Sequence, residues 1–249
     1  MPEIVKFLAF DTSTDRMSVA LTDGARVWQH SGPGGAQAST TLIPAILALL
    51  AESGMALGEL DAIAFGRGPG SFTGLRTACS VAQGLAFGAN HGAGIPVLPI
   101  DTLMAVAEEA RFQHTLAAAD VAPLVVTALL DARMDEIYLQ SYVFSSGSCT
   151  PVNGCSLIRP ENLVAGVSVR LLAGNVFSVY AGRLPAALDA LRRVEAFPTA
   201  TALLRLAPML AAAGQCVDAA LALPLYVRDK VALTTEERAL AKAGAALAS

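Results

Sequence analysis

A pattern that occurs twice constrains the fold of this 249-residue chain more than any other feature of the sequence. A dense apolar run at residues 4–10 ends in Asp11, and a polar turn and a second strand-like run follow. The apolar run 123–130 ends in Asp131 and leads again into a polar turn and a strand-like run. Apolar runs bounded by turn residues are typical of buried strands. We therefore expect an internal duplication of one structural unit.

The first part of the chain supplies the order of elements in that unit. Strands are expected at residues 4–10, 17–21, 27–30, 62–65 and 95–100, and helices at 41–53 and 71–88. Asp23–Gly24 favours a hairpin turn between the second and third strands. Ser39 or Thr40 can cap the first helix, and Pro44 is tolerated if it lies in its first turn. The order of three strands, helix, strand, helix and strand is that of a ribonuclease-H-like unit.

The second part repeats this order only as far as its opening strands. Strands are expected at 123–130, 137–144 and 169–173, and helices at 103–112, 186–194 and 201–213. The predicted fold is therefore α/β, with two ribonuclease-H-like lobes at residues 1–102 and 103–232. In this prediction the C-terminal helix can pack back on the first lobe. Residues 233–249 are expected to be an alanine-rich tail, either a short helix or disordered.

Composition excludes two classes of protein. With 54% apolar residues, the chain can bury a sizeable core and is not an intrinsically disordered protein. Its 21 acidic and 17 basic residues give a net charge of −4, which argues against a protein that holds nucleic acid alone through a broad basic face. A complex that handles RNA, in which a partner supplies the positive charge, stays open.

The sequence also predicts where the protein works. The longest candidate for a membrane-spanning helix, the apolar run 116–130, is interrupted by Asp120 and Pro123. A spanning helix needs about 20 apolar residues. Residues 1–6 lack the basic head and apolar plug of a secretion signal. We expect a cytoplasmic protein without membrane contact.

Cysteines and histidines are not spaced as metal ligands. There is no Cys-x-x-Cys and no His-x-x-x-His among Cys79, Cys149, Cys155, Cys216, His30, His91 and His114. Buried reduced thiols and no metal site are therefore expected.

The sharpest local feature is a glycine-rich block between an expected strand and an expected helix. It contains Gly66, Arg67, Gly68, Pro69, Gly70, Ser71, Phe72, Thr73, Gly74, Leu75 and Arg76. Such a turn can present backbone amides to an anion at a helix N-terminus, or it can simply let two backbones approach closely. The block has neither the Lys-Ser/Thr of a Walker A loop nor the Gly-x-Gly-x-x-Gly spacing, so both interpretations stay open.

Asp11 and Asp131 also allow two interpretations. In a two-lobed nucleotide-binding fold, aspartates at equivalent strand ends hold a metal-nucleotide between the lobes. The following turns, 12–14 and 132–134, lack the glycine that lets phosphates approach the backbone. Alternatively, each aspartate caps the amides of its own turn. Ser71 has no histidine partner visible in the sequence that could make it a nucleophile.

The two early helices are candidates for a partner interface. The first is apolar nearly all round, and the second carries small residues near a four-residue spacing, which lets another helix approach. The candidate contact residues are Leu42, Ile46, Leu47, Leu50, Gly74, Ala78, Val81, Ala82 and Leu85. Packing on the chain's own sheet explains the same pattern equally well.

Taken together, five segments resemble the TsaB (YeaZ) family over residues 4–232. They are residues 7–14, the block 66–76, Gln83–Ala86, the run Asp131–Tyr138 and Pro224–Arg228. The resemblance implies two lobes of the actin and hexokinase kind (the ASKHA fold). It implies a non-catalytic partner of TsaD, which transfers a threonylcarbamoyl group from threonylcarbamoyl-adenylate to the adenosine beside the tRNA anticodon.

The resemblance also implies how such a partner assembles. A TsaE-like ATPase joins the complex, tRNA is reached through the complex, and TsaD contacts the first two helices. Independently of the resemblance, we expect the same surface to close on itself as a homodimer when the chain is alone. No cofactor, metal or catalytic residue is expected in this chain.

Departures from the catalytic relative agree with that expectation. TsaD holds its metal with a His-x-x-x-His pair on the first helix, and the matching residues 38–42 contain no histidine. An adenosine-side glycine pair after a strand is reduced to Gly174 alone. The alternatives are an ASKHA-type ATP-dependent phosphotransferase, which would need glycine in the phosphate turns, and a glycoprotease-like hydrolase, which the missing metal ligands argue against.

Overall fold

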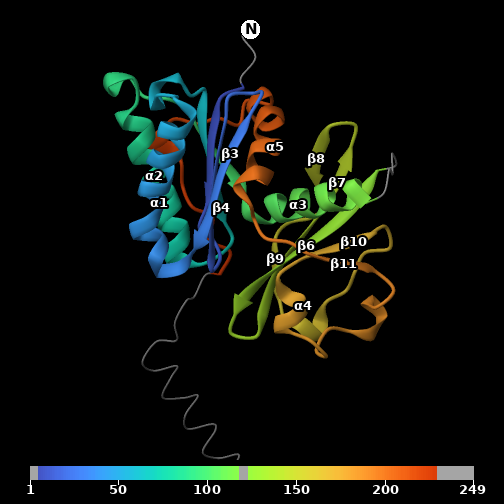
Figure 1. Cartoon of the computed structure of the whole chain (residues 1–249). Coiled ribbons are helices and arrows are strands. Elements are labelled where there is room, and N and C mark those ends of the chain that lie inside the picture. The colour runs from blue at the N-terminus through green and yellow to red at the C-terminus, as the bar shows by residue number, and fades with distance from the viewer. Residues whose placement is uncertain (1–4, 118–122, 229–249) are drawn as a thin grey trace, which may run out of the picture.

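A computed structural model describes residues 5–117 and 123–228 and contains two β-sheets with helices packed against them (Figure 1). The first sheet has five strands in the order β3-β2-β1-β4-β5. Their bounds are β1 Phe7–Asp11, β2 Arg16–Thr22, β3 Val27–Pro33, β4 Ala62–Gly68 and β5 Val97–Asp101. β1 pairs antiparallel with β2 and parallel with β4, so it is central and buried on both faces. That position explains why its sequence is a continuous apolar run.

Alternate residues of β1 supply two different layers of the core. Leu8 and Phe10 face helices α1 (Ala38–Ser53) and α2 (Phe72–Gly88). Phe7 and Ala9 face helices α3 (Thr102–Ala117) and α5 (Ala200–Ala212). α5 follows the second sheet in sequence but packs on β1, β2, β4 and β5 of the first sheet. Figure 1 shows α3 and α5 on the side of the first sheet that faces the second sheet.

The second sheet repeats the connectivity of the first. Its strands are β6 Leu124–Arg133, β7 Glu136–Ser145, β8 Ser148–Pro151, β9 Ser156–Ile158, β10 Leu171–Gly174 and β11 Arg192–Glu195. The order β8-β7-β6-β10-β11 matches β3-β2-β1-β4-β5 strand for strand, and β9 pairs with β7 outside that path. The predicted α/β fold with two ribonuclease-H-like lobes from a duplication is confirmed.

The second lobe has lost the helical cover of the first. Between β8 and β10 the chain forms only β9, a single 3₁₀ turn at Pro160–Asn162 and loops. After β10 a short helix, α4 (Val176–Val179), stands where the first lobe has α2. β8 and β9 were not expected from the sequence, because each is short and lies in a polar segment.

Three local predictions are corrected. Residues 186–194 do not form a helix: a 3₁₀ turn at Ala186–Leu188 is followed by β11, which pairs parallel with β10. Ser39 and Thr40 do not cap α1, because the helix begins at Ala38, and their hydroxyls donate to the carbonyls of Ala36 and Gln37. Pro44 consequently falls in the second turn rather than the first.

Two further predictions concern the alanine-rich tail and the expected lack of membrane contact. The alanine-rich tail, 233–249, lies outside the described residues. Among the described residues, Gly35–Ser53 is long and apolar enough by composition to cross a membrane. In the structure, α1 packs against β2, β3 and α2, as the core helix of a folded lobe does.

Candidate functional site

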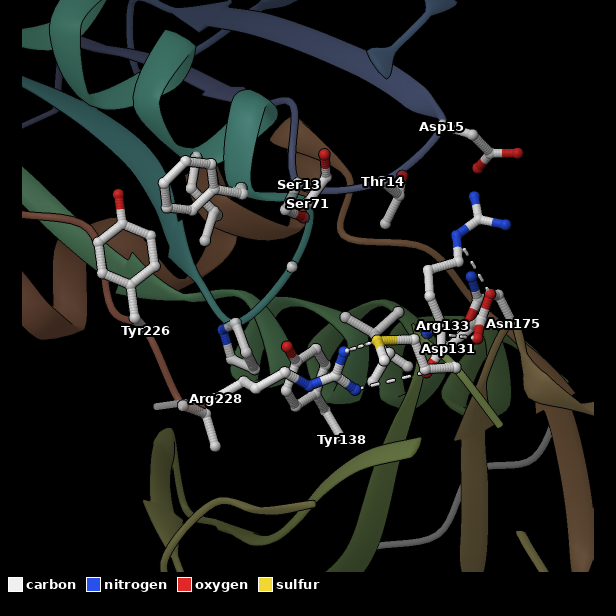
Figure 2. A pocket seen from close by; sticks show the side chains of 18 of the residues that line it. Ser13, Thr14, Asp15, Ser71, Asp131, Arg133, Tyr138, Asn175, Tyr226 and Arg228 are labelled. Atoms are coloured by element: carbon white, nitrogen blue, oxygen red, sulfur yellow. Dashed lines mark hydrogen bonds and ion pairs between the residues drawn. The ribbon is translucent and has the colours of Figure 1, made fainter. Parts of the chain in front are cut away.

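A cleft of about 460 Å³ lies between the two lobes at the ends of β1, β4, β6 and β10. Figure 2 shows Ser13, Thr14 and Ser71 on one side of it and Asp131, Arg133 and Asn175 on the other. The remaining border is formed by residues 225–228 from the C-terminal part of the chain. The duplication therefore places the two aspartate turns opposite each other, as the repeat predicts.

Asp11 stays behind the cleft wall and caps its own turn. Its Oδ1 accepts hydrogen bonds from the Ser13 amide at 2.8 Å and the Ser13 hydroxyl at 2.6 Å. Its Oδ2 is buried without a hydrogen-bond partner. Burial raises the pKa of this carboxyl to about 6, against the lowering effect of the Ser13 hydrogen bonds. The geometry agrees with the capping interpretation of Asp11.

Asp131 differs from its counterpart because it lines the cleft. Its Oδ1 accepts hydrogen bonds from the Arg133 amide at 2.9 Å and the Tyr180 hydroxyl at 2.7 Å. Its Oδ2 lies 3.6 Å from Nε of Arg133. Asn175 Oδ1 accepts a hydrogen bond from the Asp131 amide at 2.9 Å. Tyr180 and Asn175 were missed from the sequence, because they are brought to the turn by β10 and α4.

The turn after β6 achieves its shape without glycine. Arg133, Met134 and Asp135 have φ values of 62°, 56° and 60°, the left-handed region that favours glycine. Arg183 holds the turn from outside, since its Nη1 donates to Asp135 Oδ1 at 2.6 Å. This ion pair lowers the pKa of Asp135 below its ordinary value.

In the glycine-rich block, each of the four glycines accommodates another part of this chain. A Cβ at Gly66 would lie 1.7 Å from Asp11 Oδ2, and a Cβ at Gly74 would lie 1.8 Å from the Thr12 carbonyl oxygen. At Gly70 the obstacle is the Ser13 carbonyl oxygen at 2.6 Å. The Ser71 amide donates to the same Ser13 oxygen at 2.7 Å. Close approach of the Asp11 carboxyl group and of the backbone of Thr12 and Ser13 thus accounts for these glycines, and the block is a packing junction.

Other members of the block serve the same junction. Gly68 donates its amide to Thr102 Oγ1 at 3.1 Å. Nε of Arg67 forms an ion pair with Asp101 Oδ1 at 2.6 Å. Ser71 is the N-cap residue of α2, although its side chain makes no capping hydrogen bond. Pro69 lines the cleft, and Thr73 is exposed in the first turn of α2.

The structure divides the candidate interface residues of the two helices into two groups. Six of them are buried in the lobe's own packing: Leu42, Ile46, Leu50, Gly74, Ala78 and Ala82. The side chains of these six residues therefore offer little surface for direct contact with a partner. Leu47 is 54% exposed, and Val81 and Leu85 are half-buried.

Part of the outward surface of α1 and α2 is nevertheless made of apolar or small residues. We call Ile43, Leu47, Val81, Gly84 and Leu85 the α1–α2 face. Ile43 and Leu47 are exposed large apolar side chains one helical turn apart. A Cβ at Gly84 would meet nothing within 4 Å, so packing within the chain does not require glycine there.

Within residues 5–117 and 123–228, no three His, Cys, Asp or Glu side chains gather as a possible metal site. The four cysteines carry free thiols; Cys79 and Cys149 are buried as expected, whereas Cys155 and Cys216 are half-buried. Burial raises the pKa of the Cys149 thiol to about 12, so this thiol is protonated at neutral pH.

Comparison with known proteins places the chain in a family. The family model for TsaD, tRNA N6-adenosine threonylcarbamoyltransferase, matches residues 33–246. The structure of YeaZ from Pseudomonas aeruginosa is similar with a TM-score of 0.77 and 35% identity, covering 90% of this chain and 100% of that one. A second structure, an uncharacterized protein with similarity to peptidase YeaZ from Pseudomonas aeruginosa, gives a TM-score of 0.76 at 35% identity, with coverage of 90% and 100%.

Curated relatives match over a shorter stretch. The tRNA threonylcarbamoyladenosine biosynthesis protein TsaB of Haemophilus influenzae is 42% identical over 136 residues, which is 55% of this chain. TsaB of Escherichia coli is 36% identical over 138 residues, again 55% of this chain. The match spans about half the length of these relatives, 53% and 55% respectively. On the full-length structural similarity and the family model, the chain belongs to the TsaB (YeaZ) family and carries a TsaD-type domain.

Proposed function

We propose that this chain is a non-catalytic subunit in the biosynthesis of threonylcarbamoyladenosine in tRNA. In this proposal it docks on a TsaD-like enzyme and activates it, a TsaE-like ATPase joins the complex, and tRNA is reached through the complex. The proposal also places the protein in the cytoplasm. The relatives named for this pathway and the TsaD-type domain support the assignment.

The single observation that carries the docking role is the α1–α2 face. Exposed apolar side chains that lie together on neighbouring helices commonly mark a protein interface. Ile43 and Leu47 on α1 project away from the core, and Gly84 on α2 leaves room beside Val81 and Leu85 for a helix of a partner. The proposed occupant is a TsaD-like enzyme, because the family model for TsaD matches this chain and the partner would carry a domain of the same type.

A scaffold role also agrees with the cleft. The turns after β1 and β6 contain no glycine, and the glycines of the block are occupied by the chain's own backbone and by Asp11. A nucleotide phosphate needs free amides and close backbone approach at these positions. The competing assignment is an ATP-dependent phosphotransferase, which would bind magnesium-ATP in this cleft without a partner.

Threonylcarbamoyl transfer to unmodified tRNA, measured with the TsaD-like and TsaE-like proteins with and without this chain, tests the proposal. We expect transfer only when both this chain and the TsaD-like enzyme are present. ATP turnover by this chain alone would replace the scaffold by the phosphotransferase, and threonylcarbamoyl transfer by this chain alone would contradict a non-catalytic role. Activity of the other two proteins without this chain would remove the activating role.

Two matched variants test the docking surface. Leu47→Arg puts a charge on the α1–α2 face, and Val152→Arg does the same at a second-lobe position of similar exposure, 59% against 54%. We expect Leu47→Arg to weaken binding of the TsaD-like enzyme by at least about tenfold, because a buried unpaired charge is costly at an interface. Val152→Arg is expected to bind like the unchanged protein. Equal binding by all three proteins removes the surface assignment.

The same face is proposed to close on itself when the chain is alone. Light scattering over a range of protein concentrations is expected to give a dimer for the unchanged chain and a monomer for Leu47→Arg. A monomer at high concentration for the unchanged chain contradicts the homodimer.

A further inference from the structure

One segment that borders the cleft comes from the far end of the described chain. After α5 the chain returns along the first lobe, where Val217 and Val97 exchange backbone hydrogen bonds of 2.8 and 2.9 Å. The Ala222 carbonyl oxygen then accepts hydrogen bonds from Cys79 Sγ at 3.1 Å and Gln83 Nε2 at 3.0 Å, both on α2. The chain is thus fixed to the first lobe before it reaches the cleft.

Residues 225–228, here called the strap, are held at their first residue by the glycine-rich block. The Leu225 amide donates to the Arg67 carbonyl oxygen at 2.7 Å. A Cβ at Gly68 would lie 2.4 Å from the Leu225 carbonyl oxygen. Gly68, with φ of 124°, therefore leaves the space that the strap occupies. Contact with the strap is therefore a sufficient reason for glycine at position 68, and a bound nucleotide is not needed to explain it.

At its last residue the strap is bound to the second lobe. Arg228 extends toward the β6–β7 turn (Figure 2). Its Nη2 forms an ion pair with Glu136 Oε2 and lies 3.4 Å from the Arg133 carbonyl oxygen, and its Nη1 lies 3.0 Å from Met134 Sδ. The Arg228 side chain is only 16% exposed, so this contact is partly shielded from solvent.

Between these two ends the strap contacts the first turns of α2. The rings of Tyr226 and Phe72 lie 5.3 Å apart. Arg76 Nε donates to the Tyr226 hydroxyl at 3.1 Å, and the Arg76 guanidinium stacks 3.8 Å from the centre of the Phe72 ring. The strap is therefore in contact with the glycine-rich block, with α2 and with the turn that follows Asp131.

We propose that residues 225–228 are an inter-lobe strap: the contact of Arg228 with Glu136 holds the second lobe against the first across the cleft, and the strap positions α2 for partner docking. The first statement concerns this chain alone. The second rests on the proposed function, because it says that the strap controls the position of α2, and α2 carries part of the α1–α2 face to which the partner is proposed to bind. Release of the strap opens the cleft and lowers the affinity for the TsaD-like enzyme.

Charge reversal tests the strap in the isolated full chain. Glu136→Arg and Arg228→Glu each place like charges at the contact, and the double variant restores an opposite pair. We expect hydrogen exchange of the amides in residues 68–76 and 131–136 to be about tenfold faster in each single variant, the effect of losing one charged hydrogen bond. The double variant is expected to recover slower exchange than either single variant.

The control is an ion pair between an arginine and an aspartate elsewhere in the second lobe. Arg193 Nη2 lies 2.6 Å from Asp189 Oδ1 at the surface. Arg193→Glu is expected to leave exchange in residues 68–76 and 131–136 unchanged. The strap is overturned if Glu136→Arg and Arg228→Glu behave like this control, or if the double variant exchanges as fast as the single ones.

The docking arm is measured separately. Titration calorimetry with the TsaD-like enzyme is expected to show about tenfold weaker binding for Arg228→Glu than for Arg193→Glu. Equal binding by the two variants removes the positioning of α2 from the inference. If the unchanged chain does not bind the enzyme, the proposed function fails, while the exchange experiment still decides whether the strap exists.

Discussion

At the scale of single residues, the buried carboxyl of Asp11 is the least expected feature of the molecule. A charged group without a partner for one oxygen is unfavourable in a core. The fold tolerates it because the Ser13 amide and hydroxyl satisfy the other oxygen and because, below about pH 6, protonation removes the charge. The stability of the protein therefore depends on pH through this residue.

Asp11→Asn tests that dependence. Below pH 3.8, the ordinary pKa, Asp11 is protonated in both the folded and the unfolded protein, so its ionisation does not affect the free energy of unfolding. Between pH 3.8 and about 6 the carboxyl ionises only in the unfolded protein, so the folded state loses stability as the pH rises. The loss is complete above about pH 6 and amounts to about 3 kcal/mol. Between pH 4 and pH 7, urea unfolding is expected to show the variant gaining most of that amount relative to the unchanged protein. A difference that does not change with pH contradicts the assignment.

Two glycines of α2 give opposite expectations for the same substitution. Gly74→Ala places a Cβ against the Thr12 carbonyl oxygen, so the backbone must shift and stability falls by about 2 to 3 kcal/mol. Gly84→Ala points into open space, so it gains about 0.5 to 1 kcal/mol from helix propensity. Thermal unfolding of the two variants checks both signs. A stable Gly74→Ala variant would falsify the packing junction.

At the scale of elements, dense apolar strands were predictable and polar short ones were not. β1, β4 and β6 are central or nearly so, and burial on both faces forces continuous apolar sequence. β11 lies at a sheet edge and contains Arg192 and Arg193. Arginine has a high helix propensity, so the sequence predicts a helix here, but these residues pair with β10 as a strand. At such sheet edges, pairing with the neighbouring strand outweighs the helix propensity of the residues.

The candidate site likewise has parts that could be predicted from the sequence and parts that could not. The positions of Asp11, Asp131 and the glycine-rich block follow from strand ends that the sequence marks clearly. The contacts of Asp131 with Tyr180 and of Glu136 with Arg228 do not follow, since each joins residues of distant segments. An apolar helix such as α1 also does not reveal which side faces the sheet, which is why six interface candidates proved to be core residues.

That distinction between core and surface is testable on the two helices. Ala78 is fully buried, so Ala78→Glu leaves an unpaired charge in the core and costs about 4 kcal/mol or more. Leu47→Arg changes an exposed position and is expected to stay within about 0.5 kcal/mol of the unchanged protein. Chemical denaturation of both variants distinguishes them. Equal stability would mean that Ala78 is more accessible than the structure has it.

At the scale of the whole molecule, the two lobes share one core. The largest apolar cluster includes Phe7 and Ala9 of β1, Val126 and Ala128 of β6, and the inner sides of α3 and α5. Neither sheet can lose its cover on this side without exposing the other. The duplication therefore produced two sheets but not two independently stable units, and we expect both lobes to unfold together.

The single tryptophan makes this expectation measurable. Trp28 lies on β3 of the first lobe, so its fluorescence reports that lobe, whereas far-ultraviolet circular dichroism reports both. We expect the two signals to change at the same urea concentration. Leu203→Ala in α5, a fully buried position, should lower both midpoints together, with a loss of about 2 to 5 kcal/mol. A tryptophan transition separated from the circular dichroism transition means that the lobes unfold independently, and that α5 stabilises the first lobe alone.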